Sequence, residues 1–446
     1  MSTTSVPTPA NPAGWQFETR QIHAGQAPDA ATGARALPIY QTTSFVFPDA
    51  QTAANRFALS ELGPIYTRLN NPTQEAIENR IASLEGGVGA LLLASGQAAI
   101  TYSILNIAGA GDHIVASPSL YGGTYNLLKY TLADLGIETT FVENPDDLDA
   151  WRAAVRPNTK LFYGESVPNP KNDVFDIEPI AAIAHEHGVP LIVDNTVATP
   201  YLLRPIEHGA DVVVHSATKY LGGHGTSIGG VIVDSGNFDY GKDPEKFPKF
   251  NEEAPGYHGL VYARDLGVGS AFGANLSYIL KARVSLLRDT GAAISPTNAF
   301  NIGIGLETLS LRVDRHIENA RAVATWLENH PQVASVSWAG LESSPWYERA
   351  QKYLPKGPGA IVGFSLKDAT LEQTREFVDA LVLHSNVANI GDVRSLVIHP
   401  ASTTHAQLSE EELAELGISA SFVRLAVGIE ALEDIIADLE LGFATL

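Results

Sequence analysis

The stretch DVVVHSATKYLGGHG, residues 211–225, decides the fold class of this chain. Its three consecutive valines are typical of a buried strand. A glycine-rich turn follows and carries Lys219, which is flanked by the hydroxyl groups of Ser216 and Thr218. A lysine at such a place is costly unless it has a function, because burial disfavours its charge. A desolvated lysine has a lowered pKa and can attack a carbonyl carbon to form an imine. The alternative is a surface lysine in a glycine-rich turn.

Similar apolar runs precede and follow this strand. Amphipathic segments at 72–84, 122–135 and 177–187 lie between several of them. Buried strands that alternate with helices predict a mostly parallel sheet covered by helices on both faces. The expected strands are ALLLA at 90–94, HIVA at 113–116, TTFV at 139–142, KLFY at 160–163, PLIVD at 190–194, DVVVH at 211–215 and GGVIV at 229–233.

The pattern changes near residue 300, where a smaller α+β domain is expected. Helical patterns occur at 303–329 and 370–384, with expected strands near 333–338, 359–366 and 421–427. At 446 residues the chain is too long for one ordinary core. We therefore predict three parts: an N-terminal arm over residues 1–65, an α/β domain over 66–300 with a polar insertion at 236–262, and a C-terminal α+β domain over 301–446.

The composition excludes several functional classes. The formal net charge is −21, and no Lys/Arg-rich run stands out against it, so binding to nucleic acid or an anionic membrane is not expected. The absence of cysteine excludes disulfides, thiolate catalysis and cysteine-ligated metals. The N-terminus lacks a signal-peptide pattern, and the apolar stretch 90–110 carries too many polar groups for a membrane span. A cytoplasmic protein is the expectation.

Two further features point to the same chemistry as Lys219. Asp194 ends the run PLIVDNT, where α/β folds bind ligands, and its carboxylate suits a protonated pyridine nitrogen such as that of pyridoxal phosphate. The alternative is a helix N-cap. In ASGQAA, residues 94–99, Gly96 and Gln97 begin a helix whose N–H groups could bind a phosphate. The alternative is an ordinary strand-to-helix turn.

Competing motifs do not fit the sequence. It contains neither G-x-G-x-x-G nor G-x-x-x-x-G-K-[ST]. The segment HEHGV at 185–189 is not a zinc motif, because position 189 is valine. The histidines form no obvious metal cluster, so no metal site is predicted.

Taken in order, the motifs resemble the Cys/Met-metabolism class of pyridoxal-phosphate enzymes from about residue 17 to the C-terminus. The resemblance implies a fold-type I transferase with pyridoxal 5'-phosphate as cofactor. The matching motifs are YTRLNNPTQ at 66–74, SGQAA at 95–99, LYGGTY at 120–125, ESVPNP at 165–170, VDNTVATP at 193–200, SATKYLGGHG at 216–225, LRVDRHIENA at 311–320, IHPASTTH at 398–405 and VRLAVGIE at 423–430.

The resemblance also implies how the cofactor is held. Lys219 would bind it as a Schiff base, Asp194 would pair with its ring nitrogen, and Asn169 would hydrogen-bond its ring oxygen. Tyr121 would stack on the ring and assist proton transfer. The residues implied to hold the phosphate are Gly96, Gln97, Ser216 and Thr218, together with Tyr66 and Arg68 from a neighbouring subunit.

Substrate binding and assembly follow from the same resemblance. Arg424 would bind the substrate carboxylate through its bidentate fork, assisted by Asn389. A site shared between subunits needs at least a dimer, and a homotetramer is expected. An exposed Arg424 paired with Glu430 or a nearby acid is the alternative.

Within the family, VRSLVIHPASTTH at 393–405 and the insertion most resemble the O-acetylhomoserine branch. This implies γ-replacement of acetate by sulfide or methanethiol in methionine biosynthesis. Methionine γ-lyase, and cystathionine γ-synthase or O-succinylhomoserine sulfhydrylase, are the alternatives. Gly123 stands where γ-lyases have a cysteine, which disfavours the lyase. A non-catalytic regulator would need a DNA-binding extension, and the sequence carries none.

Overall fold

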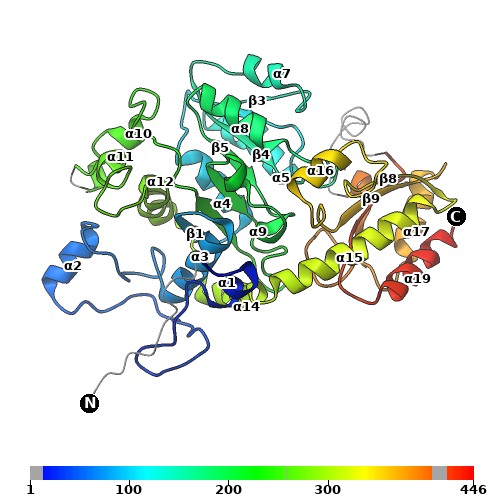
Figure 1. The fold of residues 1–446 in the computed structure, drawn as a ribbon, viewed down its shortest axis with the longest axis horizontal. Coiled ribbons are helices and arrows are strands. Elements are labelled where there is room, and N and C mark those ends of the chain that lie inside the picture. The colour runs from blue at the N-terminus through cyan, green and yellow to red at the C-terminus, as the bar shows by residue number, and fades with distance from the viewer. Residues whose placement is uncertain (1–13, 258, 404–418) are drawn as a thin grey trace.

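The computed structural model describes residues 14–257, 259–403 and 419–446. Two β-sheets lie side by side, the larger at the centre of Figure 1 and the smaller near the C-terminus. The larger sheet has the strand order β1-β7-β6-β5-β4-β2-β3. Its strands are β1 (Gly89–Leu93), β2 (His113–Ala116), β3 (Glu138–Phe141), β4 (Thr159–Glu165), β5 (Leu191–Asp194), β6 (Val212–His215) and β7 (Gly230–Asp234).

The strands from β2 to β6 are parallel to one another, and β7 runs antiparallel to both of its neighbours, β1 and β6. Every apolar run predicted for the first domain is a strand of this sheet. The prediction of a mostly parallel sheet is therefore confirmed.

Alternate side chains of the strands enter two separate cores. Leu92 and Phe162 pack in one core against the helices α3 (Pro72–Glu85), α8 (Ile177–Glu186) and α14 (Pro296–Leu306). Their neighbours Leu91 and Leu161 pack in the other core against α4 (Gly96–Leu105) and α12 (Ser277–Lys281). Helices cover both faces, which explains why the strand sequences are apolar throughout and do not alternate.

The smaller sheet has the order β10-β11-β12-β9-β8. The long helix α15 (Leu309–Glu328) runs from the larger sheet to the smaller one and packs on β8 and β9 (Figure 1). The remaining elements of this part are β8 (Val333–Ser337), α16 (Tyr347–Tyr353), β9 (Ile361–Leu366), α17 (Leu371–Asp379), β10 (Ser385–Asn386), β11 (Leu396–Ile398), β12 (Phe422–Ala426) and α19 (Leu432–Phe443).

Several boundaries differ from the sequence predictions. The helix expected at 122–135 consists of α5 (Gly122–Asn126), a π-helical turn over Leu127–Thr131 and α6 (Leu132–Asp134). The helix expected at 370–384 ends at Asp379, and the one expected at 303–329 is divided into α14 and α15. The short strands β10 and β11 were not predicted. Short strands depend on their partners more than on their own residues.

The N-terminal segment carries α1 (Phe17–His23), which packs on α3, and α2 (Ala50–Phe57), which lies away from the larger sheet (Figure 1). Short helices fill the rest of the chain: α7 (Leu148–Ala153), α9 (Thr199–Leu202), α10 (Pro248–Asn251), α11 (Tyr262–Asp265) and α13 (Arg288–Thr290). No helix of the described chain is long and apolar enough to cross a membrane. The division at residues 65 and 300 stays a prediction; each sheet lies within one predicted part, and α14 crosses the second boundary.

Candidate active site

A cavity of about 320 Å³ lies where β4, β5 and β6 end and meet the smaller sheet. Ligands of open α/β sheets bind at this edge, outside the carboxyl ends of the strands. The predicted site residues that line the cavity are Gly96, Gln97, Tyr121, Asn169, Asp194, Ser216, Thr218, Lys219, Asn389 and Arg424. Residues from seven separate segments of the sequence are thus brought together.

Lys219 lies in the turn after β6, where its backbone N–H donates to the carbonyl of Ser216. Its Nζ donates to Oδ1 of Asn389 at 2.5 Å. Burial and, to a smaller extent, the nearby charge of Arg424 lower the pKa of the Lys219 amine. The amine is therefore more nucleophilic at neutral pH than that of an exposed lysine. This contradicts the alternative of a surface lysine.

Asp194 ends β5, and its side chain is only 8% exposed. Its Oδ1 accepts hydrogen bonds from the backbone N–H and the hydroxyl group of Thr196, at 2.9 and 2.5 Å. Burial raises the pKa of Asp194, and the two bonds from Thr196 oppose that rise. The next helix, α9, begins at Thr199 with Ala198 before it, so Asp194 does not cap a helix. The N-cap alternative is wrong.

The turn from β1 into α4 approaches the turn after β6 closely. Ser95 caps α4 and accepts from the backbone N–H of Ala98 at 3.1 Å. A Cβ atom at Gly96 would lie 2.7 Å from Cβ of Ser216, so only glycine fits there. The first N–H groups of a helix have no backbone partner within the helix, and Gly96 and Gln97 at the start of α4 line the cavity together with Ser216. An anion can bind here.

Arg424 reaches the cavity from β12 in the smaller sheet and is 6% exposed. Its guanidinium donates to Oδ1 of Asn169 at 3.1 Å and to the carbonyl of Asn389 at 3.0 Å. Its Nε is buried and has no hydrogen-bond partner within the described residues. Burial lowers the pKa of Arg424 to about 10. Glu430 instead accepts from Ser395, so the exposed pair with Glu430 is wrong.

Tyr66 and Arg68 do not line the cavity of their own chain. The Arg68 guanidinium donates to the carbonyl of Arg288 and lies 5.5 Å from the ring centroid of Tyr66. Tyr66 is 41% exposed. The predicted role of this pair in a neighbouring subunit stays a prediction.

Three polar residues of the cavity, Ser95, Glu165 and Thr196, were missed in the sequence. Glu165 ends β4 as Asp194 ends β5, and the two residues are paired in the sheet. The signal that predicted Asp194 is a carboxylate at the end of a buried strand, and Glu165 has the same signal. Thr196 lies two residues after Asp194, within the quoted motif.

The residues of the cavity fit pyridoxal phosphate. Lys219 would bind its aldehyde carbon, Asp194 its ring nitrogen and Asn169 its ring oxygen. The helix start at Gly96 and the hydroxyl of Ser216 would hold its phosphate. The Thr218 hydroxyl group is less available to the phosphate, since it donates to the Gly229 carbonyl and accepts from the Gly229 N–H, both at 3.1 Å. Tyr121, 50% exposed at the cavity mouth, offers an aromatic face.

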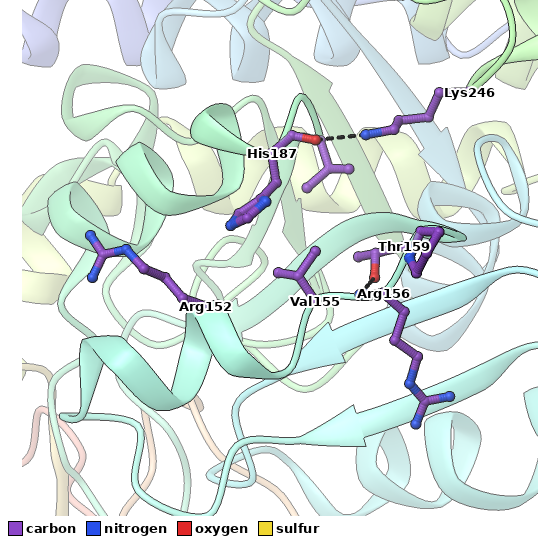
Figure 2. Close-up of a pocket in the computed structure, with 8 residues that line it drawn as sticks. Arg152, Val155, Arg156, Thr159, His187 and Lys246 are labelled. Atoms are coloured by element: carbon purple, nitrogen blue, oxygen red, sulfur yellow. Dashed lines mark hydrogen bonds between the residues drawn. The ribbon is translucent and has the colours of Figure 1, made fainter.

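A second cavity of about 320 Å³ shares no lining residue with the first, and it is a poor candidate although Arg152, Arg156 and Lys246 line it. Figure 2 shows Arg152 and Arg156 extending away from each other. Arg152 pairs with Asp149 and Glu186, and Arg156 pairs with Glu138. Lys246 donates to the carbonyl of His187 at 2.6 Å. These side chains already have partners.

The fold and the site together define a fold-type I pyridoxal-phosphate-dependent enzyme. The model of the family described as "Cys/Met metabolism PLP-dependent enzyme" matches residues 18–444. This chain belongs to that family, and pyridoxal phosphate is its cofactor.

Individual relatives agree with this assignment. The chain is 57% identical to the O-acetyl-L-homoserine sulfhydrylase of Corynebacterium glutamicum, over 97% of this chain and 98% of the relative. It is 52% identical to a homocysteine synthase of Schizosaccharomyces pombe, over 95% and 96% of the two chains. A solved O-acetylhomoserine (thiol)-lyase from Campylobacter jejuni has a TM-score of 0.91 at 39% identity, over 96% of this chain and 100% of that one. That structure contains N'-pyridoxyl-lysine-5'-monophosphate.

Proposed function

We propose that the protein catalyses a γ-replacement: O-acetyl-L-homoserine and sulfide, or methanethiol, give L-homocysteine, or methionine, and acetate. The observation that carries the proposal is the meeting of Lys219 and Arg424 at Asn389 in one cavity beside Asp194. The 57% identity with an O-acetyl-L-homoserine sulfhydrylase supports the choice of reaction.

Each residue of the cavity has its own role in this reaction. Pyridoxal phosphate, when bound, supplies an electron sink that acidifies the α-proton of an amino acid. Arg424 binds the substrate carboxylate through two N–H groups and so directs the α-proton toward Lys219. Lys219 removes that proton and then one from the β-carbon, acetate leaves the γ-carbon, sulfide adds there, and the protons return. One mobile amine with a lowered pKa can serve both carbons.

Asn389 links the two groups, because its side chain accepts from Lys219 and its carbonyl accepts from Arg424. We propose that it holds the amine near the carboxylate site. Tyr121 would cover the ring and assist proton transfer. Tyr66 and Arg68 would complete the phosphate site of a partner subunit in a cytoplasmic homotetramer. Light scattering tests the homotetramer, and cell fractionation tests the cytoplasmic location.

The reaction is tested by product analysis with O-acetyl- and O-succinyl-homoserine, each with and without sulfide. The expected result is homocysteine and acetate, only with O-acetyl-homoserine and only when sulfide is present. Release of ammonia and a 2-oxo acid without sulfide would indicate a γ-lyase and overturn the proposal. Turnover of the succinyl ester alone would assign the chain to the O-succinylhomoserine branch.

A further inference from the structure

Glu165 is a buried carboxyl group of the cavity to which the proposed reaction gives no role. It is the last residue of β4 and lies in register with Asp194, the last residue of β5. The side chain of Glu165 is 6% exposed, and it lines the cavity. Two carboxyl groups therefore lie side by side at the carboxyl ends of β4 and β5, which face the cofactor site.

The contact of Glu165 is with the backbone of Tyr121. Its Oε1 accepts from the Tyr121 backbone N–H at 2.7 Å. Tyr121 is the N-cap residue of α5, its side chain makes no capping hydrogen bond, and its ring is half exposed. The direction of the ring therefore depends on how the backbone at Tyr121 is fixed, and Glu165 supplies that contact from the centre of the sheet.

The surroundings of Glu165 favour its neutral form. No cation of residues 14–257, 259–403 and 419–446 forms an ion pair with it. The titratable groups that face it are Asp194 from β5, Asp173 from the segment after β4, and Tyr163 from β4. Burial, and next the charge of Asp194, raise the pKa of Glu165 well above its usual value.

Of the two carboxyl groups, that of Asp194 ionises more readily. It accepts two hydrogen bonds from Thr196, whereas the one that Glu165 accepts comes from Tyr121. Hydrogen bonds to a carboxylate favour its charged form, and two neighbouring buried carboxyl groups do not both ionise readily. The cations across the cavity, Lys219 and Arg424, bond to asparagine side chains and not to Glu165.

We propose that Glu165 is a positioning residue that carries a proton: its neutral carboxyl group holds Tyr121 at the mouth of the cavity and leaves Asp194 as the anion that faces the cofactor ring. The inference rests on the proposed cofactor site. It does not depend on which sulfur compound or ester the enzyme uses.

The first test compares Glu165→Gln with Glu165→Ala in the full chain. Glutamine is uncharged and keeps an oxygen that can accept from the Tyr121 N–H, whereas alanine has no acceptor. Apoprotein is titrated with pyridoxal phosphate, and binding is followed by quenching of tryptophan fluorescence. We expect Glu165→Gln to bind within about twofold of wild type and Glu165→Ala to bind about tenfold more weakly, the scale of one buried hydrogen bond. Equal weakening in both variants would show that the negative charge is needed and would overturn the proposal.

The second test detects the proton itself. The infrared difference spectrum of wild type minus Glu165→Gln at neutral pH is expected to contain the carbonyl band of a protonated carboxylic acid. Carboxylate bands in its place would overturn the proposal, even if Glu165→Ala fails to fold. The matched control is Glu78→Gln. Glu78 is also buried and accepts from a backbone N–H, that of Leu92, but it pairs with Arg283 at 2.6 Å. Its difference spectrum should contain carboxylate bands and no carbonyl band of a protonated carboxylic acid.

Neither test contains a sulfur substrate. A different overall reaction would therefore leave the expected affinities and spectra unchanged, so the failure of one proposal can be distinguished from the failure of the other.

Discussion

Lys219 and Arg424 are far apart in the sequence, and their side chains both contact Asn389. Because each group has a separate proposed task, substitution should separate covalent attachment of the cofactor from recognition of the substrate.

Lys219→Ala should reduce γ-replacement by at least about 10⁴-fold, since it removes both the base and the attachment point. Borohydride reduction followed by peptide mass analysis should find the cofactor on the peptide of Lys219 in wild type and on no peptide of the variant. Labelling of another lysine in wild type would remove Lys219 from this role.

Arg424→Lys should raise the Michaelis constant for O-acetyl-homoserine about 10–100-fold, because lysine keeps the charge but lacks the planar fork. That range corresponds to about 1.5–3 kcal/mol for a hydrogen bond to a charged group. Steady-state kinetics, with cofactor absorbance as the control for site integrity, measures the effect. Unchanged kinetics would mean that Arg424 does not contact the substrate.

Local sequence patterns were sufficient to find three parts of the cavity: Asp194, Lys219 and the helix start at Gly96. Each has a signal in the residues next to it. Contacts across the fold had no such signal. The bond from Lys219 to Asn389 and that from Tyr121 to Glu165 depend on how separate segments pack. Glu165 has the same local signal as Asp194, a carboxylate at the end of a buried strand, but its contact with the Tyr121 backbone could not be predicted from the sequence.

At the scale of elements, the close contact between the β1–α4 turn and the turn after β6 makes a prediction about glycine. Gly96→Ala would bring a methyl group to 2.7 Å from Cβ of Ser216, so the two turns must separate. We expect a loss of about 1–3 kcal/mol in the free energy of unfolding, as for other overpacked sites, and weaker cofactor binding. Thermal melting and titration of apoprotein measure both quantities.

Gly122→Ala is the matched control for Gly96→Ala, because nothing lies within 4 Å of a Cβ atom at Gly122. It should leave stability and cofactor binding almost unchanged. Equal effects of the two substitutions would mean that the contact between the turns is not what requires glycine at position 96.

The strands of the larger sheet could be predicted because they are buried on both faces and read as apolar runs. Helix ends were less predictable. Nothing in the pattern of 122–135 indicates the π-helical turn at Leu127–Thr131, and β10 is a strand of two residues that depends on β11.

At the scale of the whole molecule, the position of Arg68 outside its own cavity predicts complementation between subunits. Arg68→Ala and Lys219→Ala proteins should each be nearly inactive. After equal mixing and subunit exchange, about a quarter of the sites should contain both native residues, if a two-fold dimer shares its sites. Activity near that fraction of wild type is expected.

Native mass spectrometry of differently tagged subunits checks that exchange has occurred. If mixed dimers form without recovery of activity, Arg68 does not act across the subunit boundary. The sequence could indicate such sharing only through the family resemblance, since no pattern within one chain says which subunit a side chain serves.

The place of β1 in the larger sheet has a consequence for how the protein is made. β1 is an edge strand whose partner in that sheet, β7, begins only at Gly230. At about 5–20 residues per second, a ribosome needs on the order of 10 s to synthesise the chain between the two. During that time the apolar run ALLL of the nascent chain has no strand beside it, and unpaired apolar edges aggregate. β1, the first strand of the sheet to be translated, therefore cannot pair with β7 until more than half of the chain has been synthesised. A nascent chain stalled before Gly230 would depend on chaperones to stay dispersed.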